Sequence, residues 1–293
     1  MDNSFDHTGA NGAGRFVTGR RHIDMLRADA YASHMLAYVK KMLESNDSSS
    51  KSGVIFPFRS RFSHIERVIE WAMRIWEAEG GDAGVIAAAA IFHDSGYYIT
   101  GAGHAARSAQ VFRDYMASYK PEAFERASAA DAANAIRVAN VDKTDSVCTH
   151  TDISVDIYTP DETTADIYTP VNIAAAVRAA CSSDESINTI CAVIASHSDK
   201  HLPADENMQE ANILMDADVL DEIGAMSVLW DCFSEASTPA YDYISAYKRI
   251  LARYKFDEQE IARFRTREGK KRFLEMRRYV GAFLDGLKTE LNC

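Results

Sequence analysis

Apolar residues recur three or four positions apart along most of the chain, which is the spacing of amphipathic helices. Between Ile23 and Met42 this spacing predicts one helix of about five turns. A second helix is expected to begin near Ser63, because a serine followed three residues later by Glu66 forms a capping box. The glycine pair that starts at Gly80 is expected to end this helix.

The segment 83–94 is apolar on nearly every face, and a helix of that kind lies at the centre of a fold. Asp82 is placed to cap its first turn. The segment 268–291 predicts a solvated amphipathic helix with basic residues opposite an apolar face that contains Phe273, Met276, Val280, Phe283, Leu284 and Leu287. Further helices are expected over residues 108–119, 121–140, 173–181, 187–196 and 210–225.

One segment, at about residues 141–171, departs from this helical pattern. It is rich in β-branched residues and proline, and the sequence of residues 155–160 is nearly repeated at 165–170. Two copies are too few for a solenoid, so we expect a small irregular or β-hairpin insert, with a substrate lid as the alternative. Residues 1–22 are Gly- and Asn-rich, which predicts a flexible N-terminal tail. The expected fold is all-α, with one helical domain over residues 23–293 that carries the insert.

Composition and charge argue against several classes of protein. The 15 glycines and 6 prolines among 293 residues are too few for collagen-like, disordered or turn-rich all-β chains. A formal net charge of -11 argues against a general nucleic-acid-binding surface. No stretch approaches the roughly 20 apolar residues of a membrane-spanning helix, and we expect no signal peptide. The five cysteines form no CxxC pair, so free thiols in the cytoplasm are expected.

Four side chains stand out as candidates for chemistry: His64, the adjacent His93 and Asp94, and Asp218. The His93-Asp94 pair ends the most apolar helix, where a buried carboxylate is costly unless it is paired or binds a cation. Two imidazoles and two carboxylates, without a thiolate, suit Mn, Fe, Mg, Co or Zn. Each residue alone is more simply explained as a core or capping side chain, but their order and spacing favour a metal site.

These residues follow the pattern H…HD…D along the chain. The surrounding sequence agrees with that pattern at residues 56–59, 88–97, 104–108, 194–198, 216–224 and 266–290. On these motifs the chain resembles the HD superfamily of metal-dependent phosphohydrolases, over residues 25–291 apart from the insert. The resemblance implies an HD-domain helical bundle.

The same resemblance implies roles for particular residues. A first metal ion would be bound by His64, His93, Asp94 and Asp218. Some branches of the superfamily bind a second metal, bridged by the doublet aspartate, at positions that correspond to His104, His197 and, as a weaker candidate, His201. The catalytic residues implied are Asp94, His104 and His197. Asp216 is expected to orient one of the ligands. The 5′-nucleotidase branch has a glutamate where this chain has Tyr97, so the acid–base assignment of that branch does not carry over.

The function that the resemblance implies is metal-assisted hydrolysis of a phosphate ester, such as a nucleotide or a related small molecule. Phosphate needs cationic partners besides the metal, and the candidates next to motif residues are Arg59, Arg61 and Lys200. Two alternatives remain open. A dinuclear iron oxygenase on the same fold is suggested by the presence of both His104 and His197, and a non-catalytic metal- or nucleotide-binding module by the lack of an assigned general acid.

Overall fold

The computed structural model describes residues 21–47, 60–99, 101–121, 124, 172–199, 208–236, 242–253 and 261–292. Within these residues the chain forms 11 α-helices and one 3-10 helix, with no strand, so the predicted all-α class is confirmed for this part of the protein. The predicted insert at about 141–171 and nearly all of the helix expected over 121–140 lie outside the described residues.

The N-terminal part forms two helices where the apolar spacing predicts one. Helix α1 is Arg21–Arg27, so helical structure begins before the predicted end of the tail at residue 22, and α2 is Ala30–Asp47. Between them the Asp29 carboxylate accepts hydrogen bonds from the backbone N–H groups of Tyr31 and Ala32. The single-helix prediction is wrong because apolar spacing continues across a break that an aspartate cap creates.

Helices α3 (Arg61–Glu79) and α4 (Ala83–Phe92) follow the predicted order. The N-cap of α3 is Ser60, whose hydroxyl accepts from the backbone N–H of Ser63, so the helix begins earlier than the capping-box pattern indicates. Gly80 ends α3, and Asp82 caps α4, both as predicted.

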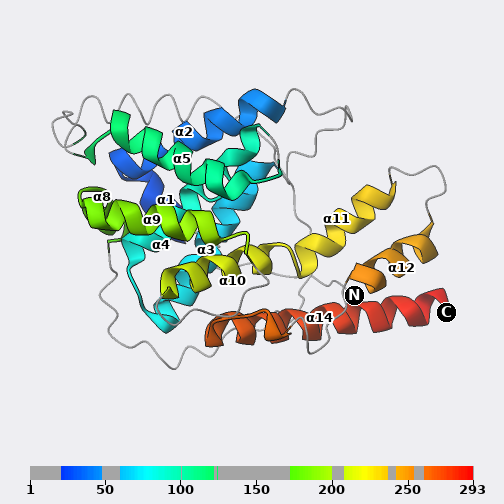
Figure 1. The fold of residues 1–293 in the computed structure, drawn as a ribbon. Helices are drawn as coiled ribbons and strands as arrows, with labels where there is room; N and C mark the ends of the chain where they lie inside the picture. The colour runs from blue at the N-terminus through cyan, green and yellow to red at the C-terminus, as the bar shows by residue number, and fades with distance from the viewer. Residues whose placement is uncertain are drawn as a thin grey trace, which may run out of the picture.

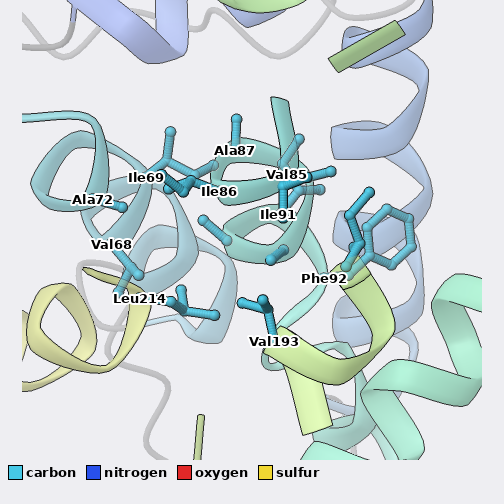
Figure 2. Packing of buried hydrophobic residues seen from close by; sticks show 14 of the residues in the cluster. Val68, Ile69, Ala72, Val85, Ile86, Ala87, Ile91, Phe92, Val193 and Leu214 are labelled. Atoms are coloured by element: carbon cyan, nitrogen blue, oxygen red, sulfur yellow. The ribbon is translucent and has the colours of Figure 1, made fainter. Parts of the chain in front are cut away.

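Helix α4 is the centre of the molecule, since every one of its residues is buried. The neighbouring elements are η2 (Ser95–Tyr98), α5 (His104–Ser118), α8 (Ile173–Cys181), α9 (Asp184–Ser196) and α10 (Gln209–Asp221). Of these, α8, α9, α10 and α5 contact α4 directly, as α3 does (Figure 1). Side chains from α3, α9 and α10 pack against α4, as Figure 2 shows for Val68, Val193 and Leu214.

The C-terminal helices are α11 (Ala225–Ala236), α12 (Tyr243–Arg253) and α14 (Arg267–Leu291), and they lie beside one another at the end of the chain (Figure 1). They share a second, smaller apolar cluster that consists of Val228, Ile250, Val280 and Leu284. The helix expected over 210–225 ends at Asp221, because Gly224, with φ 85°, turns the chain into α11. Phe283, which the sequence places on the apolar face of α14, is 48% exposed in the structure.

None of the helices in the described part of the chain is long and apolar enough to cross a membrane.

Candidate metal centre

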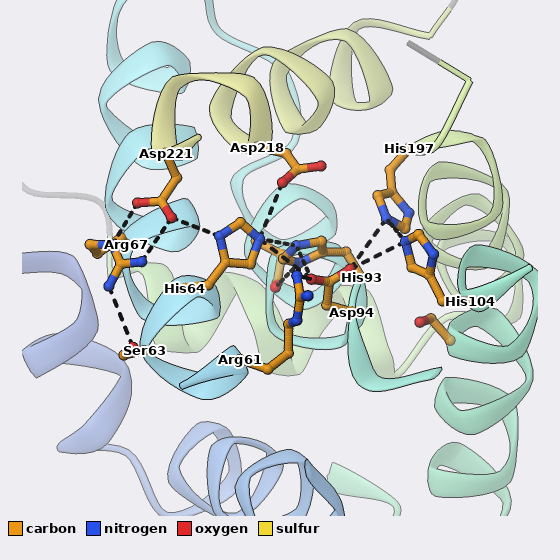
Figure 3. Close-up of polar contacts among 12 residues, drawn as sticks. Arg61, Ser63, His64, Arg67, His93, Asp94, His104, His197, Asp218 and Asp221 are labelled. Atoms are coloured by element: carbon orange, nitrogen blue, oxygen red, sulfur yellow. Dashed lines mark hydrogen bonds and ion pairs between the residues drawn. The ribbon is translucent and has the colours of Figure 1, made fainter. Parts of the chain in front are cut away.

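Helix ends bring the predicted residues together. His64 lies in the first turn of α3, and His93 and Asp94 follow the last turn of α4. Asp218 comes from α10, the helix that packs alongside α3 (Figure 3). These four side chains are far apart in the sequence and are all buried.

The first group contains His64, His93, Asp94 and Asp218. The Nε2 atom of His64 lies 3.2 Å from Oδ1 of Asp218 and 3.4 Å from Oδ2 of Asp94. The Nε2 atom of His93 lies 3.4 Å from Nε2 of His64 and 3.7 Å from Oδ2 of Asp94. Donor atoms of His64, His93 and Asp94 all lie within 4.8 Å of one another, so the three residues can share one metal ion.

The second group contains Asp94 again, with His104 and His197. The other carboxylate oxygen of Asp94, Oδ1, lies 3.3 Å from Nε2 of His104 and 3.6 Å from Nε2 of His197. These three residues also have donor atoms within 4.8 Å of one another. Asp94 therefore presents one oxygen to each group of imidazoles, which is the arrangement of a bridging carboxylate (Figure 3).

Three of the four imidazoles are oriented by the same kind of local hydrogen bond. Each donates its Nδ1 hydrogen to the backbone carbonyl three residues earlier, with distances of 2.8, 2.9 and 2.6 Å for His93–Ala90, His104–Gly101 and His197–Ile194. His93 and His197 each follow the last turn of a helix, where carbonyls lack helical partners. Because a carbonyl can only accept, this bond fixes the tautomer and leaves Nε2 as the metal-binding atom.

The donor set fits a divalent cation. The Nε2 atoms of His104 and His197 lie only 2.9 Å apart, although the Nδ1 bonds leave a lone pair on each. Two lone pairs at that distance repel each other unless a proton or a cation lies between them. Imidazole nitrogens and carboxylate oxygens without thiolates suit Mn, Fe, Co, Zn or Mg, as the sequence predicts.

Burial and the neighbouring charges set the protonation of this cluster. Burial lowers the pKa of His93 to about 4, which keeps this imidazole neutral, as a ligand must be. Burial alone would raise the pKa of Asp94, but the imidazoles of His93, His104 and His197 hold it well below its usual range. Burial would also lower the pKa of His64, but hydrogen bonds with Asp218 and Asp221 outweigh it and raise the pKa to about 9.

Gly96 allows the second group to form. A Cβ atom at this position would overlap the backbone carbonyl oxygen of His104, so only glycine lets the start of α5 approach the Asp94 loop this closely. The backbone N–H of Gly96 donates to the Ser108 hydroxyl at 2.8 Å, and Arg107 donates to the Gly96 carbonyl at 3.2 Å. These bonds hold α5 beside the doublet.

The side chain of Arg61 contacts the candidate metal centre. Its Nη1 donates to Oδ2 of Asp94 at 3.0 Å, and its guanidinium stacks 3.9 Å from the ring centroid of Tyr97. The same tyrosine ring lies 4.1 Å from the ring of His104. Tyr97 thus contacts both Arg61 and His104. The other predicted phosphate partners, Arg59 and Lys200, lie outside the described residues, as does His201.

Asp216, which the sequence predicts to orient a ligand, has a different role in the structure. Its carboxylate accepts the backbone N–H groups of Arg265 and Thr266, at 3.0 and 2.7 Å, and the Thr266 hydroxyl at 2.8 Å. Burial raises the pKa of Asp216 to about 6. Asp216 therefore holds the start of α14 against α10.

Asp221, which was not among the predicted residues, is the carboxylate that orients the ring of His64. Its Oδ2 accepts the Nδ1 hydrogen of His64 at 2.7 Å. A signal for it was present, because Asp221 follows Asp218 by three residues and so faces the same side of the helix. Asp216 precedes Asp218 by two residues and points to nearly the opposite side.

A comparison with protein-family models matches the HD domain to residues 61–144. An HD domain is therefore present at residues 61–144, and the resemblance read from the sequence is confirmed over these residues. The match includes His64, His93, Asp94 and His104, whereas His197 and Asp218 lie beyond it. No curated protein and no solved structure gives a match to this chain.

Proposed function

We propose that this protein is a metal-dependent phosphohydrolase that cleaves a phosphate ester of a nucleotide or a related small molecule. The observation that carries the proposal is the Asp94 carboxylate, which lies buried between two groups of imidazoles inside an HD domain and faces each group with a different oxygen. Such a carboxylate is suited to bridging two cations, and paired cations are a common means of stabilising phosphoryl transfer.

The ligands of the first cation in this proposal are His64, His93, Asp94 and Asp218. Asp94 is shared with a second cation, whose other ligands are His104 and His197. A bound divalent ion lowers the pKa of a water molecule and offsets negative charge on the phosphoryl oxygens. The ion itself is Mn, Fe, Mg, Co or Zn, since no thiolate belongs to either group.

Arg61 is the residue that we assign to the phosphate of the substrate. It is partly exposed, its guanidinium donates to Asp94 of the centre, and its Cζ atom lies 3.9 Å from the ring centroid of Tyr97. A planar guanidinium fixed in this way can donate two hydrogen bonds to one phosphate group. Arg59 and Lys200 remain predicted partners of the same phosphate.

The test is a screen of nucleotides and other phosphate mono- and diesters with each of the five metals added in turn. We expect hydrolysis that His93→Ala and Asp94→Ala reduce at least about 100-fold, because each removes a ligand. Glu70→Gln is the matched control, since it alters a buried carboxylate of α3 that bonds to His22 outside the centre. Unchanged hydrolysis in the Asp94 variant contradicts the proposal, and tight nucleotide binding without turnover favours a non-catalytic module.

A dinuclear iron oxygenase is the second candidate function. The observation that favours it is the nitrogen-rich second group, in which His104 and His197 approach within 2.9 Å. Elemental analysis of the purified protein separates the two functions. Two irons per chain with substrate-dependent oxygen consumption favour the oxygenase, whereas Mn, Mg or Zn with phosphate release favours the hydrolase.

We also propose that residues 23–293 form one domain and that the protein works in the cytoplasm. The larger apolar cluster extends from α1 through α10 and includes Phe273 and Met276 of α14, which supports a single domain. Cys181, Cys191 and Cys232 are free thiols, which suits a reducing compartment.

A further inference from the structure

His64 differs from the other three imidazoles of the centre in the group that accepts its Nδ1 hydrogen. His93, His104 and His197 donate Nδ1 to neutral backbone carbonyls within their own helix end or loop. His64 donates instead to the carboxylate of Asp221, which comes from another helix, at 2.7 Å. The two groups that share Asp94 are therefore chemically unequal.

Asp221 is itself fixed in position. Arg67 contacts both of its carboxylate oxygens, with Nε 2.6 Å from Oδ1 and Nη2 2.9 Å from Oδ2 (Figure 3). This bidentate geometry is the strongest that an arginine makes with a carboxylate. His64 and Arg67 both lie on α3, so Asp221 bonds to two successive turns of one helix from the facing helix α10.

From this arrangement we infer that Asp221, held by Arg67, is a positioning residue that makes the His64 group bind a divalent cation more tightly than the His104 group does. The inference rests on the proposed function, because it assumes that both groups bind metal. A carboxylate behind an imidazole fixes the ring and raises the electron density on the ligating nitrogen. The His64 group also has two carboxylates, the shared Asp94 and its own Asp218, whereas the His104 group has only the shared Asp94.

The alternative is that Asp221 and Arg67 form an ion pair that only joins α3 to α10. The two roles predict different results for metal binding. A purely structural pair affects the stability of the fold and leaves the two metal affinities in the same ratio. Removal of a positioning residue lowers the metal affinity of one group and leaves that of the other unchanged.

The experiment is a titration of the full-length, metal-free protein with Mn²⁺ alone, followed by equilibrium dialysis and elemental analysis. The unaltered protein is expected to bind two ions in two steps of different affinity. Asp221→Asn removes the charge but keeps the size of the side chain, and we expect it to weaken the tighter step by roughly 10- to 100-fold. Asp221→Glu, which retains a carboxylate, is expected to restore part of that loss.

Glu70→Gln is the matched control. Glu70 is also a buried carboxylate that accepts Nδ1 of a histidine, at 2.9 Å from His22, but it belongs to neither group. This variant is expected to lose stability and to keep both steps of Mn²⁺ binding.

The outcomes separate this inference from the proposed function. If the unaltered protein binds no Mn²⁺, the proposed function fails, and the inference fails with it. If it binds in two steps and Asp221→Asn weakens neither step, or both steps equally, the inference alone is overturned. If Asp221→Asn does not fold, Arg67→Gln takes its place, since it leaves the carboxylate and removes its anchor. A weakening confined to the tighter step then supports the inference, and its absence overturns it.

Discussion

Asp94 has a buried carboxylate whose two oxygens face four imidazole rings and one guanidinium. Imidazoles of three histidines lie within 3.7 Å of its oxygens in addition to His64, and the Arg61 guanidinium reaches it as well. A buried charge requires partners of opposite charge, and the guanidinium of Arg61 is one of them. The pKa of Asp94 lies well below its usual range, so the carboxylate is ionised, and His64, with a pKa of about 9, is the imidazole that must lose a proton before it can act as a ligand.

His64 makes the stability of the metal-free protein depend on pH. Its pKa in the folded protein, about 9, lies above its usual 6.5, so the folded state binds this proton more tightly than the unfolded state does. The contribution is complete below pH 6.5 and is lost as the pH rises through 9, and its size is about 3 kcal/mol. Asp216, with a pKa of about 6, titrates mainly below this window.

Urea denaturation with a chelator present, from about pH 6 to about pH 10, measures this effect. The free energy of unfolding is expected to fall with rising pH, and His64→Gln is expected to flatten the profile. A profile that is the same in the variant and the unaltered protein contradicts the assignment of the proton to His64.

The sequence predicted which residues meet at the centre, because a metal site requires particular side chains in a particular order. His64, His93, Asp94 and Asp218 do come together, and His104 and His197 join them through Asp94. The groups that accept the Nδ1 hydrogens of these histidines were harder to predict. Three of the imidazoles use backbone carbonyls, which leave no trace in the sequence, and helical phase places Asp221 rather than the predicted Asp216 next to His64.

At the scale of elements, the apolar pattern gave the existence of the helices and missed several of their ends. Helix α8 was predicted over its observed range, Ile173–Cys181, from the regular spacing of its apolar residues, and the structure adds that Asn172 caps it. Helix α5 begins at His104, four residues before the start predicted from apolar spacing, since its first turn has no large apolar side chain and its first residue, His104, faces the centre. Functional residues therefore interrupt the pattern where they begin or end a helix.

The contact of α4 with α8 depends on a small residue. A Cβ atom on Gly84 would overlap the backbone carbonyl of Ala176, so Gly84→Ala must push the two helices apart. We expect this variant to lose about 1–3 kcal/mol of stability, as in other overpacked cores. Gly281→Ala is the matched control, because a Cβ there meets nothing within 4 Å and alanine is the better helix former. The free energy of unfolding of the Gly281→Ala variant is expected to rise by about 0.5–1 kcal/mol.

Thermal or urea denaturation of both variants checks this prediction. A Gly84→Ala protein as stable as the unaltered one would show that α4 and α8 do not pack as closely as the structure describes.

At the scale of the whole molecule, the centre joins elements that are distant along the chain. The six side chains come from α3, the end of α4, α5, the end of α9 and α10. Helix α10 also links the centre to the C-terminal helix, since Asp216 on α10 accepts hydrogen bonds from Thr266 at the start of α14. None of the six lies on α11, α12 or α14.

A bound metal ion should therefore stabilise one part of the molecule more than another. A ligand that binds only the folded state raises the free energy of unfolding by about 2.7 kcal/mol at a free concentration 100 times its Kd. We expect Mn²⁺ to produce a rise of this size for each site and Asp94→Asn to abolish it. Hydrogen exchange should show the added protection in α3, α4, α5, α9 and α10, because ligands from these helices are joined by the ion. Uniform protection that extends equally to α11 and α12 would mean that metal acts on the fold as a whole, and no protection at all would mean that these six side chains do not bind it.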